Sequence, residues 1–129
     1  MTTQPHQADP KRVVAVIDDD PAVCNSLKFL LELEGFAVRV YGSADELLSD
    51  SSLRELSCLI VDQVMPAMSG LDMVTQLRRR GILVPAILIT SRPSAVLRTR
   101  AESAGIPIVE KPLLGNMLVD EVRLMTGSG

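Results

Sequence analysis

The chain has few aromatic residues. Only Phe29, Phe36 and Tyr41 are aromatic among its 129 residues, and there is no tryptophan. Proteins that bind single-stranded nucleic acids stack bases on aromatic side chains, so this composition argues against such a surface. The net charge of −3 argues in the same direction, because nucleic-acid-binding domains are usually basic. We therefore expect no direct nucleic-acid binding and a core of aliphatic side chains.

Other absences exclude further classes of protein. The two cysteines, Cys24 and Cys58, each lie in an apolar run and are too few for a disulfide framework. No apolar run approaches the roughly 20 residues of a membrane span, and residues 1–10 lack the apolar core of a signal peptide. No Gly-x-Gly-x-x-Gly motif or P-loop supports nucleotide binding. These features predict a cytoplasmic protein with buried thiols and no membrane contact.

Apolar segments alternate with helical patterns along the chain. The predicted strands are 13–17, 36–40, 58–61, 85–89 and 106–109; residues 36–40 alternate, and most of the other strands are apolar throughout. The helical patterns are 21–34, 43–48, a segment with Leu71, Val74 and Leu77 that ends at Arg78–Arg80, then 93–103 and 113–125. Strands that are apolar throughout indicate a parallel sheet with both faces covered, an α/β fold. We expect one domain over 11–126, with 1–10 as a disordered leader and 127–129 as a flexible end.

Polar residues follow the predicted strands where each of them ends. Asp18, Asp19 and Asp20 follow the first strand, Asp62 ends the third and Thr90 the fourth, and Lys111 follows the fifth. Ligands of open α/β sheets bind outside the carboxyl ends of the strands. Carboxylates held together there require a compensating cation, and oxygen ligands without His or Cys favour Mg²⁺. With a lysine and a hydroxyl nearby, the pattern predicts phosphoryl transfer to an aspartate.

Each of these residues also has a structural interpretation. Asp20 before Pro21 is typical of a helix N-cap, Thr90 can cap the helix that follows it, and lysines such as Lys111 are usually surface residues. Arg78–Arg80 complements the negative end of a helix dipole better than it indicates a nucleic-acid site. Only the joint occurrence of the set at the strand ends favours a shared site.

Five motifs carry a resemblance to a known family. They are Val16-Ile17-Asp18-Asp19-Asp20, Leu59-Ile60-Val61-Asp62, Met65-Pro66-x-Met68-Ser69-Gly70, Ile87-Leu88-Ile89-Thr90 and Glu110-Lys111-Pro112. In this order and spacing, over residues 12–125, the chain resembles the receiver domain of bacterial two-component response regulators. The resemblance implies a flavodoxin-like fold with five strands in the order 2-1-3-4-5 and helices on both faces.

The resemblance also implies a site. Asp62 is then the phosphoacceptor, and Thr90 and Lys111 contact the phosphoryl group. The implied ligands of Mg²⁺, or of Mn²⁺ in its place, are Asp18, Asp19, Asp62 and the backbone carbonyl of Val64. The phosphodonor is a phosphohistidine on a sensor histidine kinase or a histidine phosphotransfer protein, and the chain itself is a phosphoacceptor rather than an enzyme.

One position departs from the family pattern. Family members usually carry Phe or Tyr three residues before the lysine, and this chain has Ile108. We therefore expect signalling to depend on the loop 91–94 and the following helix, and a downstream protein to contact the face formed by that helix, the fifth strand and the last helix. Leu97 and Val119 either contribute to a homodimer face or pack inward. The resemblance also implies that Val64 and Arg92 flank the path of the hydrolytic water.

Two other functions compete with this one. The segment Asp18-x-Asp20 after an apolar strand resembles the start of haloacid-dehalogenase-type phosphatases, in which Asp18 is the nucleophile and Asp20 the acid/base. Against that, Pro21-Ala22-Val23 lacks the threonine and glycine usual there. A receiver-shaped module that binds partners without phosphorylation is the third possibility. We expect a stand-alone receiver, with a domain cut from a longer regulator as the alternative.

Overall fold

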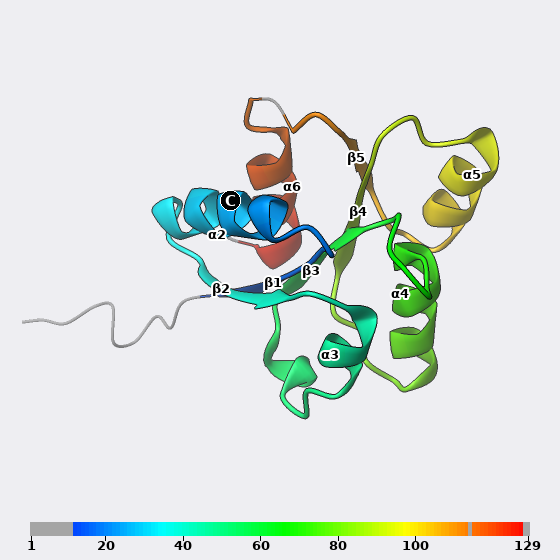
Figure 1. Ribbon diagram of the computed structural model, residues 1–129, viewed down its shortest axis with the longest axis horizontal. Coiled ribbons are helices and arrows are strands. Elements are labelled where there is room, and N and C mark those ends of the chain that lie inside the picture. Colours follow the sequence, from blue (N-terminus) through cyan, green and yellow to red (C-terminus); the bar gives the residue numbers. More distant parts are fainter. Residues whose placement is uncertain (1–11, 114, 128–129) are drawn as a thin grey trace, which may run out of the picture.

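The predicted fold is confirmed. The computed structural model describes residues 12–113 and 115–127, which form a five-stranded parallel sheet in the order β2-β1-β3-β4-β5 with helices on both faces (Figure 1). The predicted leader, residues 1–10, lies outside the described residues, as do residues 128–129 of the predicted flexible end. The strands are β1 (Val13–Ile17), β2 (Ala37–Tyr41), β3 (Cys58–Asp62), β4 (Ala86–Thr90) and β5 (Ile108–Glu110).

Helices cover the sheet in two layers. The helices are α2 (Pro21–Leu33), α3 (Ala44–Leu48), α4 (Gly70–Arg79), α5 (Ala95–Ser103) and α6 (Met117–Thr126). Helices α2 and α6 pack on one face, over Val14, Val16 and Ile60, and the other three pack on the opposite face (Figure 1). Side chains alternate between the faces of a strand, and both faces are covered, so β1, β3 and β4 are apolar and buried almost throughout.

Three helices end in the same way. In α2, the N–H of Phe36 donates to the carbonyl of Leu31, and Gly35 adopts a left-handed φ of 98°. The same pattern ends α4 at Gly81 and Ile82, and α5 at Gly105 and Ile106. This is the Schellman motif, in which the residue after the glycine is apolar and packs on the helix. Phe36, Ile82 and Ile106 are accordingly buried.

These motifs correct several predicted boundaries. Phe36 and Ile106 belong to helix ends rather than to strands, so β2 and β5 begin later than predicted, at Ala37 and Ile108. Helix α5 begins at Ala95 rather than Pro93, because the Ser94 side chain accepts a hydrogen bond from the N–H of Leu97. A short 3₁₀ helix, η1 (Leu53–Glu55), was not predicted.

The last helix also begins later than predicted, at Met117 rather than Leu113. Gly115 has a left-handed φ of 66°, which interrupts a helix at that point. Leu113 still packs against the core from the loop, so its apolar character does not reflect a helical face. Leu114, which the predicted helix over 113–125 includes, lies outside the described residues.

The burial of side chains tests the predictions for the two cysteines and for a homodimer face. Cys24 and Cys58 are free and buried, as predicted. Val119 is 2% exposed and packs inward, and Leu97 is half-buried against the core, so Val119 offers no dimer face. Among the described residues, no helix combines the length and the hydropathy that a membrane crossing requires.

Candidate functional site

Three carboxylates meet at the carboxyl edge of the sheet. Asp18 follows β1 and Asp62 ends β3, and these two strands are hydrogen-bonded neighbours. Asp18, Asp19 and Asp62 each offer a carboxylate oxygen, and these atoms lie within 4.8 Å of one another. Asp18 and Asp62 are buried, whereas Asp19 is exposed. The predicted acidic cluster is therefore present, and it opens to solvent on the side of Asp19.

Asp18 is the most deeply buried member of the cluster. Its Oδ1 accepts a hydrogen bond from the N–H of Asp20 at 2.9 Å, and its own N–H donates to the carbonyl of Tyr41. Its Oδ2 is buried and has no hydrogen-bond partner in the described part of the chain. Burial raises the pKa of Asp18, the Asp20 N–H opposes this rise, and the charge of Asp62 adds to it.

A bound cation would offset the cost of burying these carboxylates side by side. A buried carboxylate oxygen without a partner is costly, and two further carboxylates beside it add repulsion. An all-oxygen ligand set without His or Cys suits a hard cation such as Mg²⁺. The orphaned Oδ2 of Asp18 and the chemistry of the set therefore fit the metal predicted from the sequence.

Lys111 provides positive charge from the protein itself. It follows β5, and its Nζ lies 3.2 Å from Asp62 Oδ2 and 4.0 Å from Asp18 Oδ2. The first distance is a hydrogen bond, whereas the second is an ion pair too long for one. The backbone N–H of Lys111 donates to the carbonyl of Thr90. This bond fixes the start of the loop between β5 and α6 beside the end of β4. Lys111 thus contacts the predicted phosphoacceptor directly.

Thr90 ends β4 next to Asp62, because Ile89 and Asp62 are partners in the parallel register. Its side chain is 4% exposed, and its hydroxyl donates to the carbonyl of Ser91 over a long 3.4 Å. No hydrogen bond to Asp62 is recorded for it within residues 12–113 and 115–127. The structure therefore brings Thr90 to the same edge with a weakly held hydroxyl.

Val64 lies next to the acidic cluster, whereas Ile108 lies farther along the sheet. The N–H of Val64 donates to Asp62 Oδ1 at 3.2 Å, while its side chain is 73% exposed. Ile108 pairs with Leu88 in β4 and lines a cleft of about 520 Å³ between α5 and β5. Arg92 is exposed and has a left-handed φ of 48°.

Asp20 does not join the acidic cluster. Its side chain accepts a hydrogen bond from the N–H of Ala22 at 2.9 Å, which makes it the N-cap of α2, as its structural interpretation predicted. Since a haloacid-dehalogenase-type phosphatase needs this carboxylate as acid/base, the geometry disfavours that alternative.

Sequence reasoning missed the residue that connects Asp62 to α4. The carbonyl of Gln63 accepts a hydrogen bond from the N–H of Gly70, and its side-chain Oε1 accepts one from the N–H of Leu71. Gln63 therefore holds the N-terminus of α4 against the end of β3. Its position directly after Asp62 was the only signal for it in the sequence.

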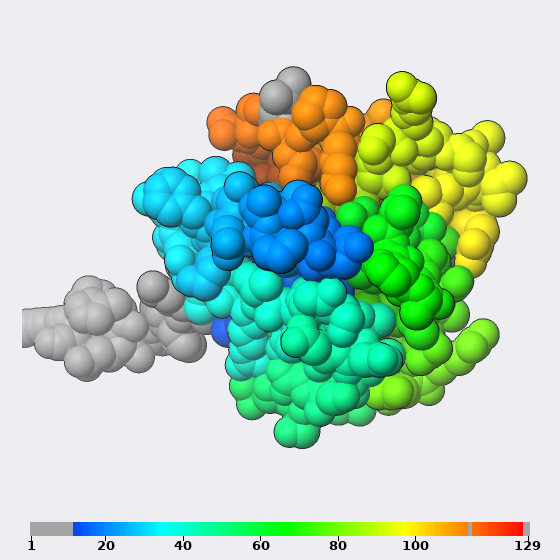
Figure 2. All heavy atoms as spheres, viewed as in Figure 1, coloured from blue at the N-terminus to red at the C-terminus, as the bar shows by residue number. Residues whose placement is uncertain are grey.

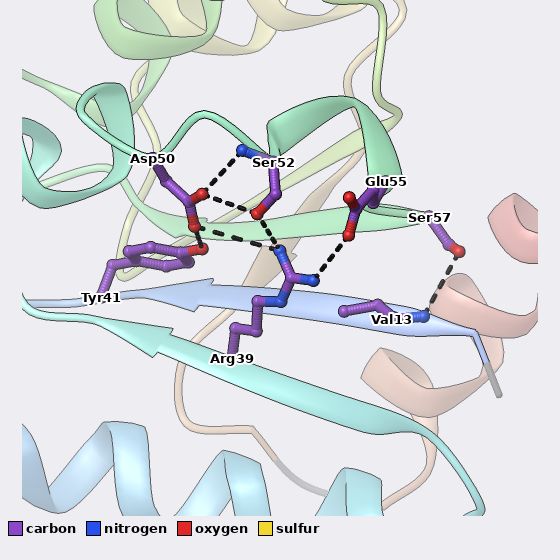
Figure 3. Close-up of polar contacts among 7 residues, drawn as sticks. All are labelled: Val13, Arg39, Tyr41, Asp50, Ser52, Glu55 and Ser57. Atoms are coloured by element: carbon purple, nitrogen blue, oxygen red, sulfur yellow. Dashed lines mark hydrogen bonds and ion pairs between the residues drawn. The ribbon is translucent and has the colours of Figure 1, made fainter.

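A second polar group at this edge was also missed. The polar residues predicted at strand ends include none after the second strand, but the hydroxyl of Tyr41 donates to Asp50, and Arg39 lies beside Asp50, Ser52 and Glu55 (Figure 3). Asp50 also accepts hydrogen bonds from the N–H and hydroxyl of Ser52, which lower its pKa to about 2. This network fixes the segment 42–55 against the edge strand.

Comparisons with known proteins identify the family. Residues 14–123 match the response regulator receiver domain family. Over 119 residues, 92% of this chain and 52% of the relative, the chain is 35% identical to response regulator protein TodT of Pseudomonas putida strain F1. The chain thus spans about half the length of the curated relatives it matches.

Solved structures agree with this match. The structure of response regulator StyR superimposes with a TM-score of 0.84 and 30% identity, covering 92% of this chain and 61% of that one. The chemotaxis protein CheY4 of Vibrio cholerae has a TM-score of 0.81 at 19% identity, covering 90% and 99%, and so shows the fold alone. The sequence match, the sheet order and the acidic cluster agree: the chain belongs to the response regulator receiver domain family of two-component signalling, a family of phosphoacceptors rather than classical enzymes.

Proposed function

We propose that Asp62 accepts a phosphoryl group from a phosphohistidine in a Mg²⁺-dependent reaction. The observation that carries this proposal is the position of Asp62, which lies within 4.8 Å of two carboxylates and 3.2 Å from the Lys111 ammonium. An isolated surface aspartate has no such surroundings. The phosphodonor is a sensor histidine kinase or a histidine phosphotransfer protein, and the reaction takes place in the cytoplasm.

Asp18, Asp19, Asp62 and the backbone carbonyl of Val64 are the proposed ligands of the metal, and Mn²⁺ serves in place of Mg²⁺. When bound, the ion supplies positive charge that reduces repulsion between the carboxylates and the phosphoryl oxygens. The Oδ2 of Asp18 supports this ligand set, because it is buried and has no hydrogen-bond partner among the described residues, and the Lys111 ammonium is 4.0 Å away.

The chain's own groups supply the rest of the chemistry. A carboxylate oxygen of Asp62 forms a bond to phosphorus as the bond from phosphorus to the histidine nitrogen breaks. The other ring nitrogen of the phosphohistidine carries a proton, so the histidine leaves as neutral imidazole. Lys111 donates a hydrogen bond to the transferred group, and the Thr90 hydroxyl turns from Ser91 to do the same. The N–H of Val64 holds the carboxylate of Asp62 in place.

Phosphorylation then changes the surface through Thr90. Turning the Thr90 hydroxyl inward moves the loop 91–94 and biases α5, so that a downstream protein binds the face of α5, β5 and α6 with changed affinity. Ile108 has no ring to exchange between buried and exposed positions, which supports a response centred on the loop.

Labelling by acetyl phosphate tests the proposal, with the covalent mass increase of the intact protein as the readout. We expect Mg²⁺-dependent labelling of the protein and none of Asp62→Asn. Asp20→Asn is the matched control, because asparagine caps a helix as well as aspartate does and the neighbouring cluster is unchanged. Undiminished labelling of Asp62→Asn overturns the assignment, and loss of labelling in Asp20→Asn favours the phosphatase alternative.

The third possibility, a receiver-shaped module that works without phosphorylation, is tested by metal binding. We expect Mg²⁺ to shift the amide resonances of residues 18, 19 and 62–64. A protein with no such shifts at millimolar Mg²⁺, and no labelling, is such a module.

A further inference from the structure

The charges of this protein are unevenly distributed. Residues 63–105 contain six arginines and two carboxylates, a net charge of +4, whereas the rest of the chain has seven basic and fourteen acidic residues. Strand β4, inside this segment, is uncharged and buried. The excess positive charge therefore lies on α4, α5 and their loops. These two helices form the green and yellow side of the molecule in Figure 2.

A groove lies between α4 and α5 within this basic region. Its volume is about 370 Å³. Ala67 and Met68 line it from the loop before α4, and Arg100 lines it from α5. One stripe of α4 lines the rest, with Asp72, Thr75, Gln76 and Arg79 at helical spacing. The groove lies outside the acidic cluster and contains none of the residues assigned to phosphotransfer.

Its two arginines are available to a ligand. Arg79 is exposed and, within residues 12–113 and 115–127, makes no recorded ion pair or hydrogen bond. Arg100 pairs with Asp72 at 3.5 Å, but both side chains are more than half exposed. Ion pairs as exposed as this one contribute little, so Arg100 can exchange Asp72 for another carboxylate at small cost.

Arg92 does not line the groove, and the three remaining arginines of the segment have other roles. Arg78 donates to the carbonyl of Ile82 and Arg80 to the carbonyl of Leu48, so both fix the chain around the end of α4. Arg98 pairs with Glu110 at 2.7 Å on the side of α5 that faces β5. Arg79 and Arg100 are thus the cations that the groove itself presents.

The remaining groups suit a peptide better than a polynucleotide. The Gln76 side chain offers both a donor and an acceptor, and Asp72 offers an acceptor for a backbone N–H. A phosphate backbone has no N–H groups for Asp72 to bind, and none of the lining residues is aromatic, so the groove offers no surface on which bases stack.

We propose that the groove between α4 and α5 docks an acidic peptide segment of a partner protein. Arg79 and Arg100 bind two carboxylates of that segment, and Asp72 and Gln76 hydrogen-bond its backbone. Arg100 lies beside Asp72, which is seven residues before Arg79 in α4, so the two arginines are separated by about 10 Å along this helix. The proposal does not depend on phosphorylation of Asp62 and is tested without it.

Binding of a fluorescein-labelled octapeptide of alternating Glu and Ser tests this proposal by fluorescence polarisation on the full chain. We expect saturable binding that weakens as ionic strength rises, because the contacts are exposed charges. The same peptide with Gln in place of Glu should bind at least fivefold more weakly. Amide shift changes on titration should lie at Ala67, Met68 and the α4 stripe.

Substitutions then separate the groove from general charge. Arg79→Gln and Arg100→Gln should each weaken binding about threefold, and the double variant about tenfold, as expected for exposed charge pairs. Arg98→Gln removes the same charge from the other side of α5 and should change the affinity less than twofold. All of these variants should retain acetyl phosphate labelling, which separates this proposal from the phosphotransfer proposal.

Three outcomes overturn the proposal. The first is a loss of peptide affinity in Arg98→Gln as large as in Arg79→Gln or Arg100→Gln, because binding would then depend only on net charge. The second is a set of shift changes outside the groove. The third is tighter binding of an octathymidylate through the same arginines, which assigns the groove to nucleic acid instead.

Discussion

Gly70 lies so close to Asp62 that a side chain at its position would clash with the backbone of β3. A Cβ placed on Gly70 would be 2.6 Å from the backbone oxygen of Asp62 and 2.9 Å from a methyl group of Val61. The contact is with backbone, which cannot turn aside as a flexible side chain does. Helix α4 thus approaches the end of β3 through a position without a side chain.

We predict that Gly70→Ala destabilises the fold by about 2 kcal/mol, the usual size of an overpacking effect. Urea unfolding followed by circular dichroism measures this change. Gly42→Ala is the matched control: its Cβ would lie 3.4 Å from the flexible Glu46 side chain, and Gly42 has no left-handed φ. A control variant destabilised as much as Gly70→Ala would contradict the role of this close approach.

The second prediction concerns Asp18, whose pKa burial raises above its ordinary value of 3.8. A raised carboxyl pKa means that the folded protein holds more protons than the unfolded chain above about pH 4. Stability therefore falls as the pH rises through that window, and at pH 7 the ionised Asp18 is destabilising. We expect Asp18→Asn to raise the free energy of unfolding at pH 7, in EDTA, by about 1 kcal/mol.

Saturating Mg²⁺ should make Asp18→Asn less stable than the unsubstituted protein, because the metal binds to and stabilises the unsubstituted protein and not the variant. Urea unfolding at pH 7 with and without Mg²⁺ provides both measurements. Asp120→Asn, an exposed substitution on α6, should change the stability by less than about 0.5 kcal/mol in either condition. If Asp18→Asn is less stable than the unsubstituted protein in EDTA, the burial argument is wrong.

The third prediction uses the single tyrosine of the chain. Burial raises the pKa of the Tyr41 phenol, the hydrogen bond to Asp50 raises it further, and Arg39 lowers it. Asp50→Asn should therefore lower the pKa of Tyr41, and Arg39→Gln should raise it. Ultraviolet absorbance of tyrosinate during an alkaline titration reports this residue alone, since there is no tryptophan.

The two substitutions change the charge around Tyr41 in opposite directions, so each serves as the control for the other. Two shifts of the same sign would indicate a general loosening of the segment 42–55 rather than the network shown in Figure 3. Asp50 itself has a pKa lowered to about 2, so the stability it contributes is present above about pH 4 and is lost as the pH falls toward 2.

The sequence predicted the acidic cluster because strand ends are readable from local patterns. Apolar runs stop at Asp18 and Asp62, and a parallel sheet brings such ends to one edge. The strand order itself came from the family resemblance, because no local pattern specifies which strands are neighbours. The structure then placed β1 beside β3 and β4 between β3 and β5.

Other features depended on contacts that local patterns do not encode. Phe36 and Ile106 are apolar and follow helices, so they resemble strand starts, but each packs beneath its own helix end. The hydrogen bond from Leu71 to Gln63 and the pairing of Arg39 with Glu55 join segments that fold back on each other. Such pairs become visible only when the backbone path is known.

The last prediction concerns how the site communicates with α5. The Thr90 hydroxyl is held only by a long bond to Ser91, and Ile108 cannot act as a rotating ring. We expect Thr90→Val, which keeps the shape and removes the hydroxyl, to retain labelling at Asp62. Beryllium fluoride with Mg²⁺ mimics the phosphoryl group. On its addition, amide shift changes should extend through residues 91–98 in the unsubstituted protein, whereas in Thr90→Val they should stop near Asp62. Thr75→Val is the control, because the Thr75 hydroxyl bonds within α4 to the carbonyl of Leu71. Shift changes that reach α5 equally in Thr90→Val would show that the hydroxyl does not transmit the signal.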